Sequence, residues 1–144
     1  MSEPLHLVCP SCGAINRVPA NRLGQGPVCG KCKAALMPGE PVEVSAAQLA
    51  KAIAKSEVPL VVDFWAPWCG PCRTMAPEFA KAAAQFKGRA LFLKCNTEAH
   101  PQAGQAHQVQ GIPLLALFSG GREVDRLPGA RPASAIGGWV QSLL

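Results

Sequence analysis

Apolar residues gather in three short stretches of the chain that have the length and composition of strands. Val58 to Trp65 is mostly apolar and β-branched, Leu114 to Phe118 is apolar throughout, and Ala90 to Asn96 alternates. Short runs of this kind between turn signals are typical of strands. We therefore expect these three stretches to form a buried sheet.

Helical patterns stand between the strands. Ser45 followed by Gln48 is a capping box that predicts a helix over 46–55, after a short first strand. Helix formers with apolar residues at helical spacing follow Pro71 and continue to Gly88. The first half of the pattern therefore alternates strand and helix.

The second half of the pattern ends differently. Pro101 fits the first turn of a short helix over about 101–107, and Gly120-Gly121 predicts a hairpin turn into a strand over 123–126. An amphipathic pattern predicts a closing helix over 134–144. The element order β-α-β-α-β-α-β-β-α predicts an α/β fold with a mixed sheet that ends in an antiparallel hairpin. The apolar face of the closing helix holds Ile136, Trp139, Val140 and Leu143.

The composition favours a packed protein that does not enter a membrane. The chain has 144 residues, 49% of them hydrophobic, which is enough for one ordinary domain with a small attachment. The first eight residues carry neither a basic segment nor a long apolar run, and no stretch approaches membrane-spanning length. We therefore expect a soluble, cytoplasmic monomer without a membrane partner.

The formal charge of +5 does not indicate a nucleic-acid partner. The basic residues are scattered, and no run of five or six occurs. Four thiolates that bind one Zn²⁺ would also lower this charge by two. We therefore do not expect nucleic acid among the partners.

Four of the seven cysteines form two C-x2-C pairs near the N-terminus. Cys9 and Cys12 are separated from Cys29 and Cys32 by sixteen residues, a spacing typical of a structural zinc site with four cysteine ligands. The segment between the pairs is too short and too rich in glycine and proline to bury much apolar surface, so a metal would supply folding energy. Two disulfides and an iron site of rubredoxin type are the alternatives.

A proline- and glycine-containing segment follows the cysteine pairs. Leu36 to Val44 holds two prolines and one glycine, and this composition predicts a linker that leads into the first strand. We therefore expect two domains, a zinc ribbon over 1–38 and a larger domain over 39–144.

A second kind of cysteine chemistry is predicted where the strand that ends at Trp65 turns into a helix. Cys69 and Cys72 are three residues apart, and they lie on one face of the first helical turn. The free N–H groups and the positive dipole end of a helix stabilise an anion, which favours the reactive thiolate of Cys69. A thiolate beside a second thiol predicts a two-electron redox site. The alternatives are a further metal pair and an inert structural disulfide.

The stretch from Asp63 to Arg73 resembles the thioredoxin family, whose active-site motif WCGPC stands here at Trp68 to Cys72. The element order predicted over 42–144 is that of the thioredoxin fold, a central mixed sheet flanked by helices. The N-terminal cysteines match the thioredoxin 2 subgroup, which carries a zinc ribbon. The resemblance implies a thiol-disulfide oxidoreductase that reduces protein disulfides, with Cys69 as nucleophile and Cys72 as resolving cysteine.

The resemblance also implies roles outside the motif. Asp63 matches a buried aspartate that shuttles the proton of the resolving cysteine, and burial in an apolar strand would raise its pKa. Lys94 matches the lysine that pairs with this aspartate. Pro113 matches a proline that is cis, where the backbone of Ile112 would receive an extended substrate peptide as an added strand.

Substrate contact is implied for a group of residues around the cysteines. Leu114 departs from the threonine that the family usually has after the cis proline, so we expect either the substrate contacts or the packing next to the cysteines to differ there. Trp65 is expected in the core. The expected substrate-binding residues are Trp68, Gly70, Pro71, Ile112, Pro113 and Gly129.

The implied cofactor is one structural Zn²⁺, and no bound nucleotide or flavin is expected because no Gly-rich phosphate loop follows a strand. The implied partners are disulfide-containing protein substrates and a separate NADPH-dependent thioredoxin reductase. Two other functions stay open. One alternative is a zinc-ribbon module that binds protein or nucleic acid and carries an accessory thioredoxin domain. The other is a redox sensor that ejects zinc on oxidation.

Overall fold

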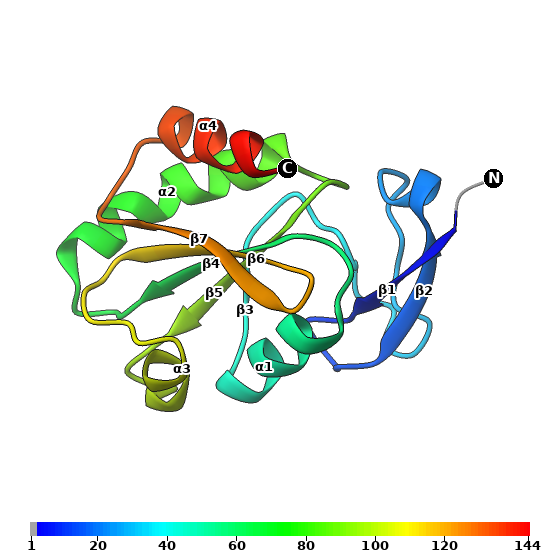
Figure 1. Cartoon of the computed structure of the whole chain (residues 1–144), viewed down its shortest axis with the longest axis horizontal. Helices are drawn as coiled ribbons and strands as arrows, with labels where there is room; N and C mark the ends of the chain where they lie inside the picture. The colour runs from blue at the N-terminus through cyan, green and yellow to red at the C-terminus, as the bar shows by residue number, and fades with distance from the viewer. Residues whose placement is uncertain (1–2) are drawn as a thin grey trace.

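Five strands form the central sheet of the protein, in the order β3-β5-β4-β6-β7. The structure is a computed structural model, and it describes residues 3–144 (Figure 1). Strands β3 and β4 run parallel to β5, β6 is antiparallel to β4, and β7 is antiparallel to β6. The expected mixed sheet with a terminal hairpin is therefore confirmed. The strands are Val42–Glu43 (β3), Leu60–Trp65 (β4), Leu91–Asn96 (β5), Leu114–Ser119 (β6) and Arg122–Pro128 (β7).

Helices cover both faces of this sheet. Helices α2 and α4 lie on one face, and α1 and α3 lie on the other (Figure 1). The expected capping box closes the N-terminus of α1, since Ser45 and Gln48 exchange side-chain and backbone hydrogen bonds. Within residues 3–144, no helix combines the length and the apolar character needed to cross a membrane. The helices are Ala46–Lys55 (α1), Gly70–Gln85 (α2), Pro101–Ala106 (α3) and Ala133–Leu143 (α4).

The central strand β4 is buried on both faces. Val61 packs with the side chains of α2 and α4, while Val62 and Phe64 pack with those of α1 on the opposite face. This two-sided burial is why the strand is apolar at nearly every position. Asp63 is the exception, and the alternation along β4 directs it to the same face as Val61.

The N-terminal ribbon contains a hairpin that the sequence pattern did not indicate. Strands β1 (Pro4–Val8) and β2 (Ile15–Pro19) pair antiparallel, and a single 3-10 turn, η1 (Ala20–Arg22), follows them. The cysteine pairs sit in turns at the end of this hairpin and in the loop after it. In Figure 1 the ribbon lies on the right, whereas α2 begins at the far left end of the sheet. The metal-binding candidate and the redox candidate therefore lie at opposite ends of the molecule.

The ribbon shares a hydrophobic core with the larger domain. Leu7 and Cys9 are buried in the same cluster as Leu49 of α1. Leu36 and Met37, at the start of the expected linker, are also buried there. These two residues of the expected linker therefore belong to the core that the ribbon shares with the larger domain.

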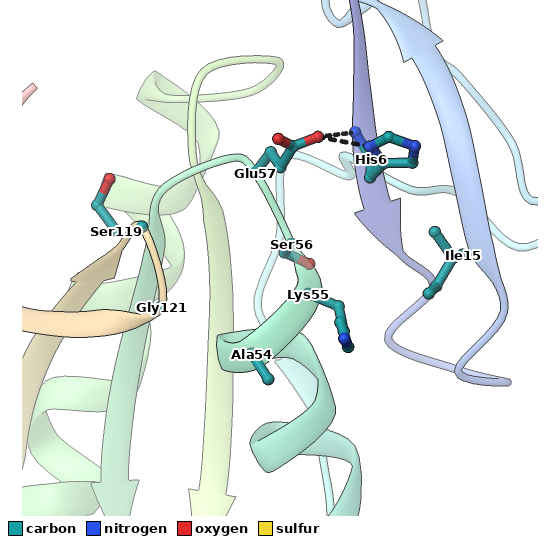
Figure 2. Close-up of a pocket in the computed structure, with 9 residues that line it drawn as sticks. His6, Ile15, Ala54, Lys55, Ser56, Glu57, Ser119 and Gly121 are labelled. Carbon is teal, nitrogen blue, oxygen red and sulfur yellow. Dashed lines mark hydrogen bonds and ion pairs between the residues drawn. The ribbon is translucent and has the colours of Figure 1, made fainter.

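Polar contacts reinforce this attachment. The backbone N–H of Val8 donates to the buried Ser56 Oγ at 3.1 Å, and the Glu57 N–H donates to the His6 carbonyl at 2.8 Å. The Glu57 carboxylate in turn accepts from the His6 backbone N–H and contacts its ring, each at 2.7 Å (Figure 2). A cleft of about 650 Å³ lies beside these residues and reaches Gly121 of the β6–β7 turn. Strand β1 is thus fastened along the segment after α1.

Removal of the Ser56 hydroxyl is expected to destabilise the whole chain. Ser56→Ala leaves the buried N–H of Val8 without an acceptor, at a cost of roughly 1–3 kcal/mol in the free energy of unfolding. Urea unfolding followed by circular dichroism measures the change, with the exposed Ser134→Ala as the matched control. A loss no larger than that of the control would show that this contact does not hold the ribbon in place.

Candidate functional site

The redox candidate lies at the N-terminus of α2. Cys69 is the N-cap residue of this helix, and it is joined to Cys72 by a disulfide. The Sγ atom of Cys69 accepts the backbone N–H of Cys72 at 3.2 Å. This hydrogen bond and the helix dipole both stabilise negative charge on Cys69 Sγ, as the strand-to-helix position predicts. Both cysteines are buried, whereas the neighbouring Trp68 is 67% exposed.

The turn between the two cysteines begins the helix. Gly70 and Pro71 are its first residues, and the fixed φ of proline suits this position because the missing N–H is unbonded there in any helix. The guanidinium of Arg73 donates to the Pro67 carbonyl at 2.9 Å, which ties the first turn to the loop after β4. The redox turn is therefore fixed both by the start of α2 and by its hydrogen bond to the loop after β4.

A loop from the other half of the sheet faces the disulfide. Cys69 Sγ lies 3.8 Å from the Ile112 carbonyl oxygen, and the Ile112-Pro113 bond is cis, as expected. The Gly129 N–H donates to the Pro113 carbonyl at 3.0 Å, and Gly129 has a φ of +86°, a conformation that favours glycine. Leu114 is buried and pairs in register with Phe64. The sheet thus brings residues far apart in sequence to one surface.

Beside this surface lies a shallow hollow of about 370 Å³. It continues the surface formed by the Ile112-Pro113 loop toward β7. The residues that line it include Gln108, Gln110, Ile112, Pro113, Arg126 and Gly129.

Asp63 lies behind the redox turn on β4 and is fully buried. No side chain or backbone group of residues 3–144 forms a hydrogen bond with either of its carboxylate oxygens. Burial raises the pKa of Asp63 to about 7, although the positive charge of Lys94 acts in the opposite direction. The expected burial and raised pKa are both confirmed, and the aspartate does not face solvent.

Lys94 is the register neighbour of Asp63 on β5, but its ammonium group lies beside Glu43 and Trp65. Lys94 Nζ lies 4.0 Å from Glu43 Oε1 and 4.4 Å from the centre of the Trp65 ring. Trp65 is thus only partly the core residue that was expected, since one ring face meets a cation. Glu43 is a residue that the sequence did not single out, because its position on a two-residue strand gives no periodicity.

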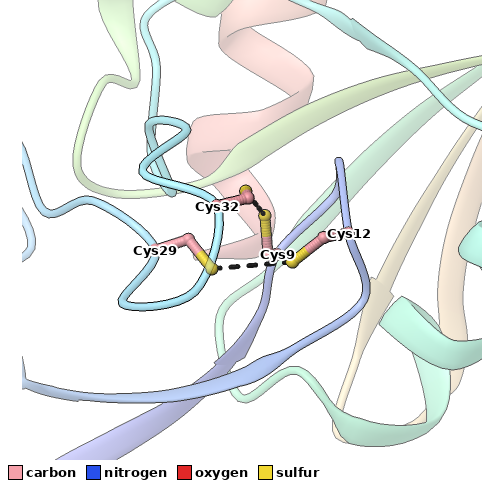
Figure 3. Close-up of side chains that lie close together, drawn as sticks. All are labelled: Cys9, Cys12, Cys29 and Cys32. Carbon is pink, nitrogen blue, oxygen red and sulfur yellow. Dashed lines mark hydrogen bonds between the residues drawn. The ribbon is translucent and has the colours of Figure 1, made fainter.

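The four N-terminal cysteines converge on one point, as their spacing predicts. Their Sγ atoms lie within 4.8 Å of one another (Figure 3). The pairs Cys9–Cys32 and Cys12–Cys29 each have sulfurs 3.6 Å apart, so each turn contributes one sulfur to each pair. A tetrahedral zinc ion with Zn–S bonds of about 2.3 Å needs sulfurs about 3.8 Å apart. The donor set and its spacing therefore fit Zn²⁺.

Other cysteine and histidine residues form no comparable cluster within residues 3–144. Cys95 is fully buried in β5, and burial raises the pKa of its thiol to about 11. A thiol of this kind is unreactive at neutral pH, as its place in an apolar strand predicts.

Comparison with known proteins gives two matches to protein families. The model of the family described as thioredoxin matches residues 40–142, and the model described as thioredoxin 2, N-terminal, matches residues 8–34. The first match alone covers more than half of the chain. The chain belongs to the thioredoxin family.

Individual relatives agree with this assignment. The chain is 42% identical to thioredoxin C-3 of Corynebacterium nephridii over 138 residues, which cover 96% of this chain and 94% of that protein. It is 37% identical to a thioredoxin of Synechocystis over 71% of this chain and 95% of that protein. Among solved structures, an N21Q mutant thioredoxin from Halobacterium salinarum matches with a TM-score of 0.66 at 28% identity, covering 74% of this chain and 92% of that chain.

Family membership and site geometry give the same chemistry. The disulfide-forming cysteine pair at the start of α2 makes this chain a thiol-disulfide oxidoreductase. The four-cysteine cluster lies in the part that matches the zinc-ribbon family model, which assigns a zinc site to the ribbon.

Asn16 of β2 is a second residue that the sequence did not single out. Its side-chain oxygen accepts the Gly30 N–H at 2.9 Å, and its amide nitrogen contacts the Ala14 carbonyl at 3.2 Å and Cys29 Sγ at 3.5 Å. Asn16 therefore joins the turn of the first cysteine pair to the turn of the second. Groups in this position orient metal ligands, and their loss commonly lowers metal affinity by about 10–100-fold.

The affinity of the ribbon for zinc is expected to fall when Asn16 is replaced. Asn16→Ala removes the link between the two turns and the donor to Cys29, so we expect zinc to bind about 10–100-fold more weakly. Competition with a chromophoric chelator measures the affinity in the full chain. Gln25→Ala, at an exposed position of the same ribbon, is the control. Equal affinities for the two variants would contradict the role given to Asn16.

Proposed function

We propose that this chain is a cytoplasmic protein-disulfide reductase that works through the Cys69–Cys72 dithiol. The observation that carries the proposal is the position of the pair, with Cys69 Sγ at the α2 N-terminus and 3.8 Å from the Ile112 carbonyl. This arrangement combines a stabilised thiolate with a neighbouring backbone that can bind an extended peptide. The proposed domains are a ribbon over 1–38 and a catalytic domain over 39–144.

The first step forms a mixed disulfide. The Cys69 thiolate attacks one sulfur of the substrate disulfide, the substrate S–S bond breaks, and the other substrate sulfur leaves as a thiolate that takes up a proton. The hydrogen bond from the Cys72 N–H and the α2 dipole lower the free energy of the attacking thiolate. Because thiol-disulfide exchange needs the thiolate, this stabilisation determines the fraction of reactive enzyme at neutral pH.

The second step releases the substrate. The Cys72 thiol loses its proton, its sulfur attacks Cys69 Sγ, and the second substrate sulfur leaves, so that two electrons have moved from the protein to the substrate. Asp63 is proposed as the base that accepts the Cys72 proton, with Lys94 acting on its charge. A pKa near 7 suits a group that both accepts and returns a proton at neutral pH.

Substrate binding is proposed for the surface around the disulfide. Trp68 supplies an exposed aromatic face, and the backbone at Ile112 and Pro113 receives an extended substrate segment. Gly70, Pro71 and Gly129 border this surface and leave room for a peptide backbone. Main-chain recognition of this kind suits a reductase that acts on many different proteins.

The zinc ion is proposed to be a single structural ion. Cys9 and Cys29 lie in the core shared with α1, so the metal would hold together a part of the fold rather than a catalytic surface.

We also propose that a separate NADPH-dependent thioredoxin reductase returns Cys69 and Cys72 to the dithiol form, and that the chain is a monomer that binds neither nucleotide nor flavin. A reducing compartment such as the cytoplasm keeps a metal site of four cysteine thiolates intact.

Serine variants of the two cysteines are expected to behave differently. Cys72→Ser should accumulate a covalent complex with oxidised insulin, because the mixed disulfide forms but is not resolved. Cys69→Ser should form no complex, and both variants should fall to the uncatalysed rate in a reductase-coupled insulin assay. Non-reducing mass spectrometry detects the complex, and Cys95→Ala is the control with full activity. Insulin reduction by Cys69→Ser would contradict the proposal that Cys69 is the nucleophile.

Replacement of Asp63 is expected to slow the second step. Asp63→Asn removes the proposed base, so resolution of the mixed disulfide should slow about 100-fold, while the first attack keeps its rate. Rapid-quench kinetics separate the two steps.

The stability of the wild-type protein should also depend on the charge of Asp63. Because the folded state raises the pKa of Asp63 to about 7, the free energy of unfolding should fall as pH rises from the ordinary pKa of aspartate to about 7. The stability of Asp63→Asn should lack this fall, and equal slowing of both steps would contradict the proton-transfer role.

A further inference from the structure

Three charged residues lie in one row across the sheet. Glu43 of β3 is in register with Lys94 of β5, and Lys94 is in register with Asp63 of β4. Their side chains share the sheet face that α2 covers. The row therefore runs from a fully buried carboxylate at the centre to a half-exposed carboxylate at the edge, with a single ammonium group between them.

The ammonium group is placed toward the edge of this row. Lys94 Nζ lies 4.0 Å from Glu43 Oε1 and 4.4 Å from the centre of the Trp65 ring, and it forms no ion pair within 4.0 Å with Asp63. The Asp63 oxygens have no hydrogen-bond partner among residues 3–144. An isolated charged carboxylate is costly in such a site, whereas Lys94 next to it would offset the cost. The position of Lys94 thus determines how well the charged form of Asp63 is tolerated.

We propose that Glu43 is a positioning residue that competes with Asp63 for the ammonium group of Lys94 and holds it at the edge of the sheet. Glu43 acts through Lys94 and touches neither the substrate nor the disulfide. Its effect on catalysis rests on the proposed role of Asp63 as the base in the second step. Its effect on Asp63 itself exists whether or not Asp63 takes part in catalysis.

The charges around the row agree with this competition. Lys94 lowers the pKa of Asp63 and Glu43 raises it, after burial as the main cause. The pKa of Glu43 is itself raised by burial, while Lys94, the Trp65 side chain and His100, just before α3, act to lower it. Opposite Asp63, β6 presents the apolar Leu115, and α2 contributes the redox pair at its N-terminus. Among residues 3–144, Lys94 and Glu43 are therefore the charged groups that shift the pKa of Asp63.

Removal of the Glu43 charge should release Lys94 toward Asp63. In Glu43→Gln, we expect the pKa of Asp63 to fall by on the order of one unit, because an opposite charge within about 4–6 Å favours the carboxylate. The matched control is Glu40→Gln, which removes the same charge from an exposed position three residues away. Glu43 is half exposed, so its replacement by the isosteric amide leaves the core unchanged.

The pKa is measured by carbon-13 NMR titration of the full-length, zinc-loaded, oxidised chain. Asp63 and Asp125 are its two aspartates, so labelled aspartate gives two carboxyl signals, and the Asp125 signal serves as an internal control. A Lys94→Met background separates two physical causes. If Glu43 acts by holding Lys94, Glu43→Gln should change the Asp63 pKa much less in that background.

Two outcomes would overturn the inference. One is an Asp63 pKa that moves no more in Glu43→Gln than in Glu40→Gln. The other is a shift that persists in full without Lys94, which would make Glu43 a source of direct repulsion. In kinetics, the acid limb of the pH–rate profile for the resolution step should move to lower pH in Glu43→Gln. The reason is that Asp63 becomes a stronger acid when its pKa falls. If the NMR shift occurs without this kinetic change, Glu43 keeps its role and the proposed function of Asp63 fails.

Discussion

The burial of β4 on both faces of the sheet is the constraint on which the rest of the structure depends. This strand carries Asp63 inside the protein and ends at the loop that begins α2 with Cys69. Because β5 and β6 flank it, the strand cannot shift its register without moving apolar side chains out of both cores. A rigid strand therefore sets the distance between the buried carboxyl group, the disulfide and the Ile112-Pro113 loop. Fixed geometry of this kind is what a reaction between three sulfur atoms in line requires.

The ribbon is attached to the opposite end of the same sheet. It contributes Leu7, Cys9 and Cys29 to the core cluster that contains Leu49 of α1, and it is hydrogen-bonded along the segment after that helix. A ribbon of this size cannot bury enough apolar surface to fold alone, so metal binding and docking on α1 both stabilise it. Its distance from the disulfide leaves the proposed substrate surface uncovered by the ribbon. Zinc binding and disulfide exchange are thus separate in space, and their cysteines lie in different hydrophobic clusters.

Electrostatics at the redox end is governed by burial more than by pairing. Asp63 has a lysine as its register neighbour, yet the ammonium group lies beside Glu43 and Trp65. The carboxylate has no hydrogen-bond partner among residues 3–144, and its pKa is close to neutrality because the group is buried. Polar groups that are buried without partners destabilise a protein, so they persist where function needs them. Burial has a different consequence for Cys95, because it raises the pKa of the thiol and so makes the thiol unreactive at neutral pH.

Local sequence determined the parts of this protein that depend on neighbours along the chain. The apolar runs gave the three central strands, the Ser45 and Gln48 pair gave the start of α1, and the cysteine spacings gave both the redox turn and the zinc cluster. The tertiary structure alone decided which distant residues meet. The pairing of β1 with β2, the burial of Leu36 and Met37, the contacts of Asn16 with the second cysteine turn and the approach of Glu43 to Lys94 all join parts of the chain that meet only in the folded protein. Such contacts leave no periodic pattern in the sequence, because a single side chain that reaches across a sheet or between two turns is specified by the fold around it.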